Sequence, residues 1–294
     1  MEKIRVNTLV IGAGRSGTTT ICSMLASHPD VIFSKIKEVH FFSIPALYKR
    51  GVSYYHTFFN NKKGKPVVAS ADTYLMIDHG AIRKIQDYNP DMKIVVILRD
   101  PVERAYSSYN YSINYGHHES YPAFTDSIAK EKNIASEPDI VMRNNKGHFY
   151  AGLYAYHLEK WMEVFNPSQV LLLTTRQLRN EPLLLAGKLF RFLNIDLIEA
   201  VSGNENPAAV PKSKKLEKFL LDRDAPLRKM IRNLTPATVK RLIFSSGFVD
   251  MIHKANRKTK TATPLSDEEN QIAYNYFKDD LKMLKKIFGI DLLR

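Results

Sequence analysis

Residues 9–20 read Leu-Val-Ile-Gly-Ala-Gly-Arg-Ser-Gly-Thr-Thr-Thr, and this stretch decides the predicted fold. Residues 8–11 are β-branched or apolar, which is typical of a short buried strand. Three glycines then fall within six residues and favour a tight turn. Apolar residues next recur with helical spacing at Ile21, Met24 and Leu25. The stretch therefore predicts strand, glycine turn and helix, and a helix N-terminus facing the turn favours an anion.

Three ligand-binding interpretations of this turn remain open, beside a turn that only packs strand on helix. Glycines at 12, 14 and 17 fit the dinucleotide-binding pattern. The pair Gly12 and Gly17 fits a Walker loop, except that Thr18 stands where that loop has lysine. The third interpretation is an anion loop whose cation is Arg15. Its hydroxyl groups come from Ser16, Thr18, Thr19 and Thr20.

Composition places the chain among globular proteins. It has 294 residues, of which 44% are hydrophobic and 25% charged, enough for a sizeable core. We predict a single domain over residues 1–294, with its core at about 5–200 and a helical part at about 211–294. Cys22 is the only cysteine, so an internal disulfide is impossible and we read it as a packing residue. Because no membrane span and no signal-peptide core are visible, we expect a cytoplasmic protein.

The net charge of +13 is distributed unevenly. Most of the basic excess lies in residues 211–294. Such a region favours an anionic partner: a nucleotide, an acidic glycan, a lipid headgroup or a nucleic acid. Peripheral contact with a membrane surface through this part is one form of that hypothesis. The competing interpretation is a solvated helical surface.

Residues 93–98 form the clearest strand, apolar on both faces as in the centre of a parallel sheet. Asp100 as N-cap and Pro101 at the first helical position predict a helix start directly after it. Arg99 therefore lies at the carboxyl end of a strand, where open α/β sheets bind ligands. Ser107 follows two turns into the helix. The alternative role for Arg99 is an ion pair with a neighbouring acid.

Glu38 and His40 form a candidate catalytic pair. They are two residues apart, so in extended chain both side chains point to one side. Apolar neighbours at Val39, Phe41 and Phe42 predict a raised pKa for the carboxyl, which suits a general base. A surface glutamate beside a histidine with its own partners is the alternative.

The remaining pattern alternates strands and helices. We predict an amphipathic helix near 153–165, a buried strand at 169–174 and a helix at 182–193. A last long helix begins after Ser266, with Glu269 completing a capping box. This alternation predicts an α/β fold: a P-loop-like parallel sheet flanked by helices, with a helical, basic C-terminal extension.

Three motifs together resemble one known family. They are residues 14–19, residues 38–42 (Glu-Val-His-Phe-Phe) and residues 97–107 (Ile-Leu-Arg-Asp-Pro-Val-Glu-Arg-Ala-Tyr-Ser). In order and spacing they resemble the sulfotransferases that use 3′-phosphoadenosine 5′-phosphosulfate (PAPS). The likeness is to the glycan (heparan sulfate-type) branch and its bacterial relatives, and it covers roughly residues 5–200.

The resemblance implies roles for particular residues. It implies that the 5′-phosphosulfate is bound by the first motif. The residues concerned are Gly14, Arg15, Ser16, Gly17, Thr18 and Thr19. Arg99 and Ser107 would bind the 3′-phosphate, with Lys212 and Ser213 as further candidates from a C-terminal loop. Glu38 would be the catalytic base, supported by His40.

The same resemblance implies adenosine 3′,5′-bisphosphate as a product. No metal-binding cluster of His, Cys or Asp is visible in the sequence, so we expect no metal, whose place the fixed arginines could take. Where many relatives have lysine this chain has Arg15, which stabilises charge but cannot give up its proton. The acceptor stays open among carbohydrate, lipid and small-molecule hydroxyls, with an amine as the less favoured alternative, and no nucleic acid is expected. The rival functions are a P-loop phosphotransferase on ATP or GTP, and a non-catalytic binder of nucleotides or nucleic acid.

Overall fold

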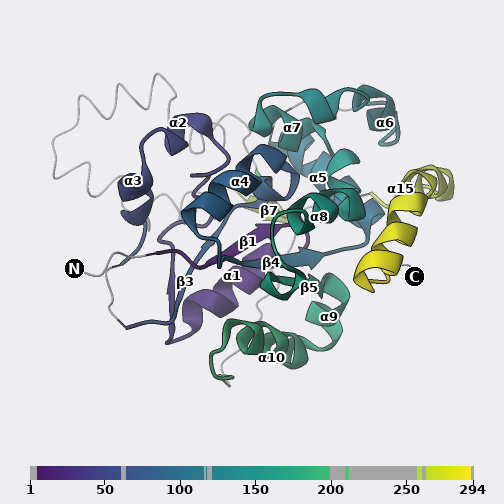
Figure 1. Cartoon of the computed structure of the whole chain (residues 1–294). Coiled ribbons are helices and arrows are strands. Elements are labelled where there is room, and N and C mark those ends of the chain that lie inside the picture. Colours follow the sequence, from purple (N-terminus) through teal and green to yellow (C-terminus); the bar gives the residue numbers. More distant parts are fainter. Residues whose placement is uncertain are drawn as a thin grey trace.

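The computed structural model describes residues 5–60, 64–115, 117, 121–198, 209–211, 257–259 and 263–292. Its centre is a five-stranded sheet in the order β2-β3-β1-β4-β5, with every neighbouring pair parallel (Figure 1). The strands are β1 (Thr8–Gly12), β2 (Val31–Phe33), β3 (Val67–Ala71), β4 (Lys93–Leu98) and β5 (Val170–Thr174). The predicted α/β class with a parallel sheet is confirmed.

Helices connect these strands. The α-helices are α1 (Thr18–Ser27), α2 (Pro45–Tyr48), α3 (Val52–His56), α4 (His79–Tyr88), α5 (Pro101–Asn114), α6 (Asp126–Lys130), α7 (Ile140–Lys146), α8 (Tyr154–Met162), α9 (Thr175–Asn180), α10 (Pro182–Leu193) and α15 (Asp267–Phe288). Short 3₁₀ segments are η1 (Thr73–Ile77), η2 (Ile134–Ser136), η3 (Tyr150–Gly152) and η4 (Pro167–Gln169).

Both faces of the sheet are buried, which explains why its strands are apolar throughout. Val10 and Val95 point to the side covered by α1 and α10. The alternate residues, Leu9 and Val96 among them, point to the side covered by α4, α8 and α15. Figure 1 shows α1 and α10 on one side of the sheet and α4 and α8 on the other. The carboxyl ends of β1 and β4 therefore meet at one edge of a sheet enclosed on both faces.

Local capping signals were reliable where they were strong. Ser266 Oγ accepts a hydrogen bond from Glu269 N at 3.2 Å, and Glu103 N donates to Asp100 Oδ1 at 2.9 Å, so both predicted helix starts are confirmed. Four short helices were missed: α2, α3, α7 and α9. Asp139 caps α7 and Thr174 caps α9, and both helices are too short to show an apolar period.

The predicted C-terminal helix is confirmed, and the described residues add a short strand pair that was not predicted. The helix is α15, and the two strands are β6 (Ala209–Pro211) and β7 (Arg257–Thr259), paired antiparallel. Three-residue strands that pair over such a sequence separation leave no local periodicity to detect. Within the described residues, no helix combines the length and the hydropathy needed to cross a membrane.

Candidate active site

The turn after β1 adopts backbone conformations that few residues tolerate. Gly17, the N-cap of α1, has φ 98°, and a Cβ there would lie 2.9 Å from Leu178 Cδ2. Arg15 also has a positive φ, 71°, although it is not glycine. Left-handed backbone at a non-glycine residue is strained, and such strain is concentrated at functional sites. The turn is thus a candidate binding loop as well as a packing element.

The loop is held against the end of β4, the strand next to β1. Thr175 Oγ1 lies 2.7 Å from the carbonyl of Ser16 and 3.2 Å from that of Leu98, so this hydroxyl ties α9 to the loop and to β4. Ala13 N donates to the carbonyl of Ile97 at 2.8 Å. The sequence did not indicate Thr175, because its partners are distant along the chain.

The structure brings Arg15 of this loop together with Arg99 and Ser107. Arg15 Nε donates to Ser107 Oγ at 3.2 Å, and Arg99 Nη1 donates to the carbonyl of Arg15 at 3.3 Å. Arg99 Nε also pairs with Glu103 Oε2 at 3.0 Å, so the ion pair weighed against a binding role is present too. The Arg15 guanidinium lies 4.7 Å from the ring centre of Tyr111. Two cations and a hydroxyl therefore meet at one edge of the sheet.

Other predicted loop residues divide by exposure. Thr18 and Ser16 are buried, whereas Thr19 is exposed. The Ser16 hydroxyl makes no hydrogen bond of ordinary geometry with the described residues, although the Tyr154 hydroxyl lies near it. A buried hydroxyl without such a bond is a candidate contact for an anion in the loop. Lys212 and Ser213 lie outside the described residues.

Glu38 lies next to the loop. Its Oε2 accepts hydrogen bonds from Thr73 N at 2.7 Å and Thr73 Oγ1 at 3.3 Å, and its Oε1 pairs with Lys37 Nζ at 2.8 Å. A Cβ placed on Gly14 would lie 3.8 Å from Thr73 Oγ1, so Thr73 bridges the loop and the carboxylate. The Glu38 side chain is 28% exposed, enough to meet a substrate.

The pKa of Glu38 differs from the expectation. Burial raises it, as the apolar neighbours predicted. However, the positive charge and hydrogen bond of Lys37 and the Thr73 N–H together hold the pKa below its ordinary value. The carboxyl is therefore ionised at neutral pH and can accept a proton without a preceding deprotonation.

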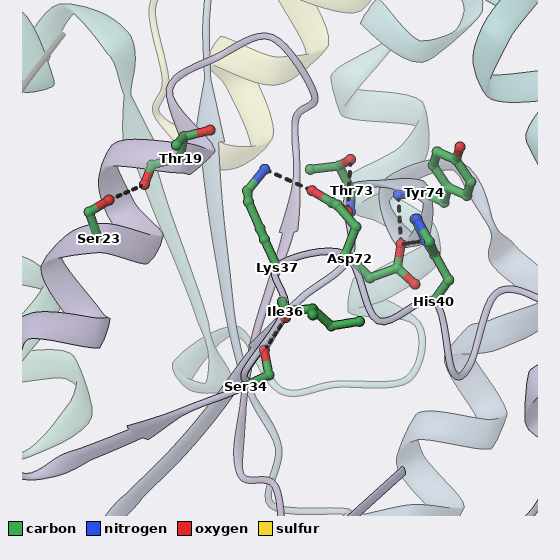
Figure 2. A network of polar contacts seen from close by, with 10 residues as sticks. Thr19, Ser23, Ser34, Ile36, Lys37, His40, Asp72, Thr73 and Tyr74 are labelled. Carbon is green, nitrogen blue, oxygen red and sulfur yellow. Dashed lines mark hydrogen bonds and ion pairs between the residues drawn. The ribbon is translucent and has the colours of Figure 1, made fainter. Parts of the chain in front are cut away.

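His40 is held by an acid that the sequence did not reveal. Its Nδ1 lies 2.8 Å from Asp72 Oδ1 (Figure 2). Ser43 Oγ donates to the other oxygen of the same carboxylate, Asp72 Oδ2, at 2.6 Å. The His40 ring stacks on Tyr74 with centroids 4.3 Å apart, and its backbone has φ 57°. Burial lowers the pKa of His40, but the hydrogen bond and charge of Asp72 outweigh this and raise it. Asp72 is in a segment far from His40 in sequence, which is why no spacing rule found it.

Glu38, His40 and Asp72 also bring three potential metal-ligand atoms within 4.8 Å of one another, a cluster that the sequence did not show. Those atoms are already engaged. His40 bonds to Asp72, and the Lys37 ammonium lies against Glu38 and opposes a second cation. The arrangement fits a hydrogen-bonded network better than a metal centre.

The chain is similar to known proteins over most of its length. Residues 6–216 match the family model described as "Sulfotransferase domain". The bifunctional heparan sulfate N-deacetylase/N-sulfotransferase 1 of Caenorhabditis briggsae is 28% identical over 194 residues, covering 64% of this chain and 22% of that protein. The heparan sulfate glucosamine 3-O-sulfotransferase 3B1 of Mus musculus is 29% identical over 192 residues, covering 62% and 44%. The matched part is thus about a fifth to a half of these relatives' lengths.

Solved structures share the fold. A sulfotransferase from Alicyclobacillus acidocaldarius superposes with a TM-score of 0.67 at 20% identity, covering 98% of each chain. The mouse sulfotransferase SULT7A1 complexed with PAP superposes with a TM-score of 0.51 at 13% identity, covering 97% of this chain and 89% of that one.

Proposed function

Because the chain belongs to the sulfotransferase family, we propose that it moves a sulfuryl group from PAPS to an acceptor hydroxyl. The observation that carries this proposal is the meeting of the glycine turn, Arg99 and Glu38 at one edge of the sheet. Arg99 Nη1 lies 3.3 Å from the Arg15 carbonyl, and Thr73, which donates to Glu38, lies beside Gly14 of the loop. One nucleotide could span from the loop to Arg99 with its reactive end beside the carboxylate.

In this proposal the donor is held at its two charged ends. The loop N–H groups, the N-terminus of α1 and Arg15 bind the 5′-phosphosulfate. Arg99 and Ser107 bind the 3′-phosphate, which would replace the contact between Ser107 and Arg15. The Ser16 hydroxyl makes no hydrogen bond of ordinary geometry within the described part of the chain, which supports the choice of an oxygen-rich anion for the loop.

Glu38 accepts the proton of the acceptor hydroxyl as the oxygen attacks sulfur. The new bond joins acceptor oxygen to sulfur, and the bond from sulfur to the 5′-phosphate oxygen breaks. Charge that develops on the departing phosphate is stabilised by Arg15 and the loop N–H groups. Thr73 N–H fixes Glu38 Oε2 at 2.7 Å, and Lys37 keeps the carboxyl ionised before the reaction. Positioning and fixed charges would supply most of the rate increase, and no metal is needed.

For the acceptor we propose a carbohydrate hydroxyl. The curated relatives are named for heparan sulfate, which is a glycan. Partly exposed aromatic rings at Tyr74, Tyr111 and Tyr115 lie around Arg15 and His40, and they offer flat apolar surfaces to a sugar ring.

The test is incubation with donor carrying labelled sulfur and a panel of glycan, lipid and small-alcohol acceptors. We expect sulfated glycan and an equal amount of adenosine 3′,5′-bisphosphate, unaffected by a metal chelator. Transfer of phosphate from ATP in place of sulfate from PAPS would contradict the proposed function. Sulfation of lipid or small alcohol alone would contradict only the acceptor class.

A further inference from the structure

Helix α8 begins without a capping side chain of its own. Its N-cap, Leu153, offers no oxygen to the free N–H groups of the first turn. The partner comes from the C-terminal helix. Asp280 of α15 accepts hydrogen bonds from Ala155 N at 3.1 Å and Tyr156 N at 3.0 Å. One carboxylate on α15 thus does the work of an N-cap for α8.

The first residue of α8 reaches the proposed donor site. Tyr154 is fully buried, and its hydroxyl donates to the carbonyl of Arg99 at 3.0 Å. The same hydroxyl lies near the Ser16 side chain of the glycine turn. Tyr154 therefore connects the two segments proposed to hold the two ends of the nucleotide. Asp280 is thus linked to Arg99 through the first turn of α8, which it caps, and through the hydrogen bond of the Tyr154 hydroxyl.

Close packing also fixes α15 against the start of α8. A Cβ on Gly152 would lie 2.7 Å from Phe277 Cε1 of α15 and 3.5 Å from Pro101 Cβ of α5. Phe277 is fully buried there. Figure 1 shows α15 beside α8 at the C-terminal end of the chain. The start of α8 is therefore enclosed between α15 and the helix that follows Arg99.

We propose that Asp280 is a positioning residue for donor binding: by capping α8 it sets the Tyr154 hydroxyl, which donates a hydrogen bond to the carbonyl of Arg99 beside the glycine turn. The proposal rests on the proposed function, because it assigns the α15 contact to the PAPS site. Under this proposal α15 supports the PAPS site through α8, without touching the reacting atoms.

The test is Asp280→Asn in the full chain, which keeps the shape but turns an N–H₂ group toward the N–H donors. We expect the Kd for adenosine 3′,5′-bisphosphate and the KM for PAPS to rise roughly 2- to 30-fold, the range for coupling through contacting residues. The kcat at saturating PAPS should not change. Asp279→Asn is the matched control. Its side chain is 91% exposed and pairs only with Lys282 in the described part of the chain, so its Kd and KM should match wild type.

A double-mutant cycle separates positioning from general destabilisation. If Asp280 acts through Tyr154, the double variant Asp280→Asn, Tyr154→Phe should bind the bisphosphate as weakly as Tyr154→Phe alone. Leu189→Ala, in the core on the opposite face of the sheet, serves as a variant of lowered Tm whose bisphosphate Kd should stay near wild type.

The outcomes distinguish failure of the proposed function from failure of the role of Asp280. If wild type binds no adenosine 3′,5′-bisphosphate, the proposed function fails. If wild type binds it and Asp280→Asn binds it equally well, only the role of Asp280 is overturned. Additive losses in the double variant, or a kcat loss with unchanged KM, would also overturn that role.

Discussion

The glycine turn and the carboxylate cluster at Glu38 face the same edge of the sheet but are built differently. The turn is made from one continuous strand–turn–helix segment, and its shape depends on backbone, as the positive φ of Gly17 shows. The cluster is made mainly from side chains of two separate segments: residues 37–43, which have no regular structure, and residues 72–74 at the start of η1. The first would bind the donor, whereas the second would move the proton.

This difference separates the expected effects of substitution. Because the backbone shapes the glycine turn, we expect most single substitutions there to have little effect, except at its glycines and at Arg15. Substitutions at those positions should weaken the affinity for the donor. A side-chain cluster depends on each partner, and changes there should appear in turnover and in its pH dependence. Substitutions at the glycine turn should therefore change donor affinity, whereas substitutions in the carboxylate cluster should change turnover.

Glu38→Gln should lower kcat by roughly 10²- to 10⁴-fold, the range for a lost general base. Affinity for adenosine 3′,5′-bisphosphate should stay the same, because Glu38 does not hold the nucleotide. Glu163→Gln is the control, since it removes a carboxylate of a Lys–Glu pair that is 2.6 Å apart on the surface of the same protein. Near-normal turnover of Glu38→Gln would remove Glu38 from the mechanism.

Arg99→Ala should raise the Kd for the bisphosphate by roughly 10- to 150-fold, because a hydrogen bond to a charged group contributes about 1.5–3 kcal/mol. Isothermal titration calorimetry measures this directly. Arg83→Ala serves as control, since Arg83 lies on α4 and bonds to Gln86. An unchanged Kd in Arg99→Ala would show that the ion pair with Glu103 is the whole role of this arginine.

Asp72→Asn should lower kcat about fivefold, since it weakens one hydrogen bond of about 1 kcal/mol that orients His40. It should also lower the pKa of His40, because Asp72 is the group that raises it. NMR titration of the ring reports that pKa. Ser43→Ala, which leaves the contact between His40 and Asp72 in place, should lie closer to wild type. A larger loss in Ser43→Ala than in Asp72→Asn would contradict this reading of the cluster.

Lys37→Met should change the pH profile more than the maximal rate. Glu38 works as the ionised base, so activity falls when pH drops through its pKa, which Lys37 and Thr73 hold below the ordinary value. Removing the ammonium raises that pKa, so the acid limb of kcat/KM should move to higher pH. Well above the limb, kcat should be nearly unchanged. A limb that stays in place would mean that Lys37 does not act on Glu38.

The same division explains what the sequence could predict. The strand, turn and helix at residues 8–27 and the helix start after Arg99 rest on short-range signals: glycine spacing, an N-cap, a proline and apolar periodicity. The position of Arg99 at the carboxyl end of a strand followed from the apolar run before it and the helix start after it.

The cluster was less predictable because its partners are brought together only by the fold. Nothing near Glu38 or His40 in sequence indicates Asp72 or Thr73, and the lowered pKa of Glu38 depends on both Lys37 and the Thr73 N–H. The capping of α8 by Asp280 of α15 joins segments still further apart. Such contacts carry no periodic or motif signal.

The most direct test of a nucleotide site that spans the glycine turn and Arg99 is a calorimetric comparison of adenosine 3′,5′-bisphosphate with adenosine 5′-monophosphate and ATP on the wild-type chain. If one nucleotide spans the glycine turn and Arg99, the bisphosphate binds at least about 10-fold more tightly than the monophosphate, since only it reaches Arg99. Equal affinities for the bisphosphate and the monophosphate, or tighter binding of ATP, would contradict this binding site.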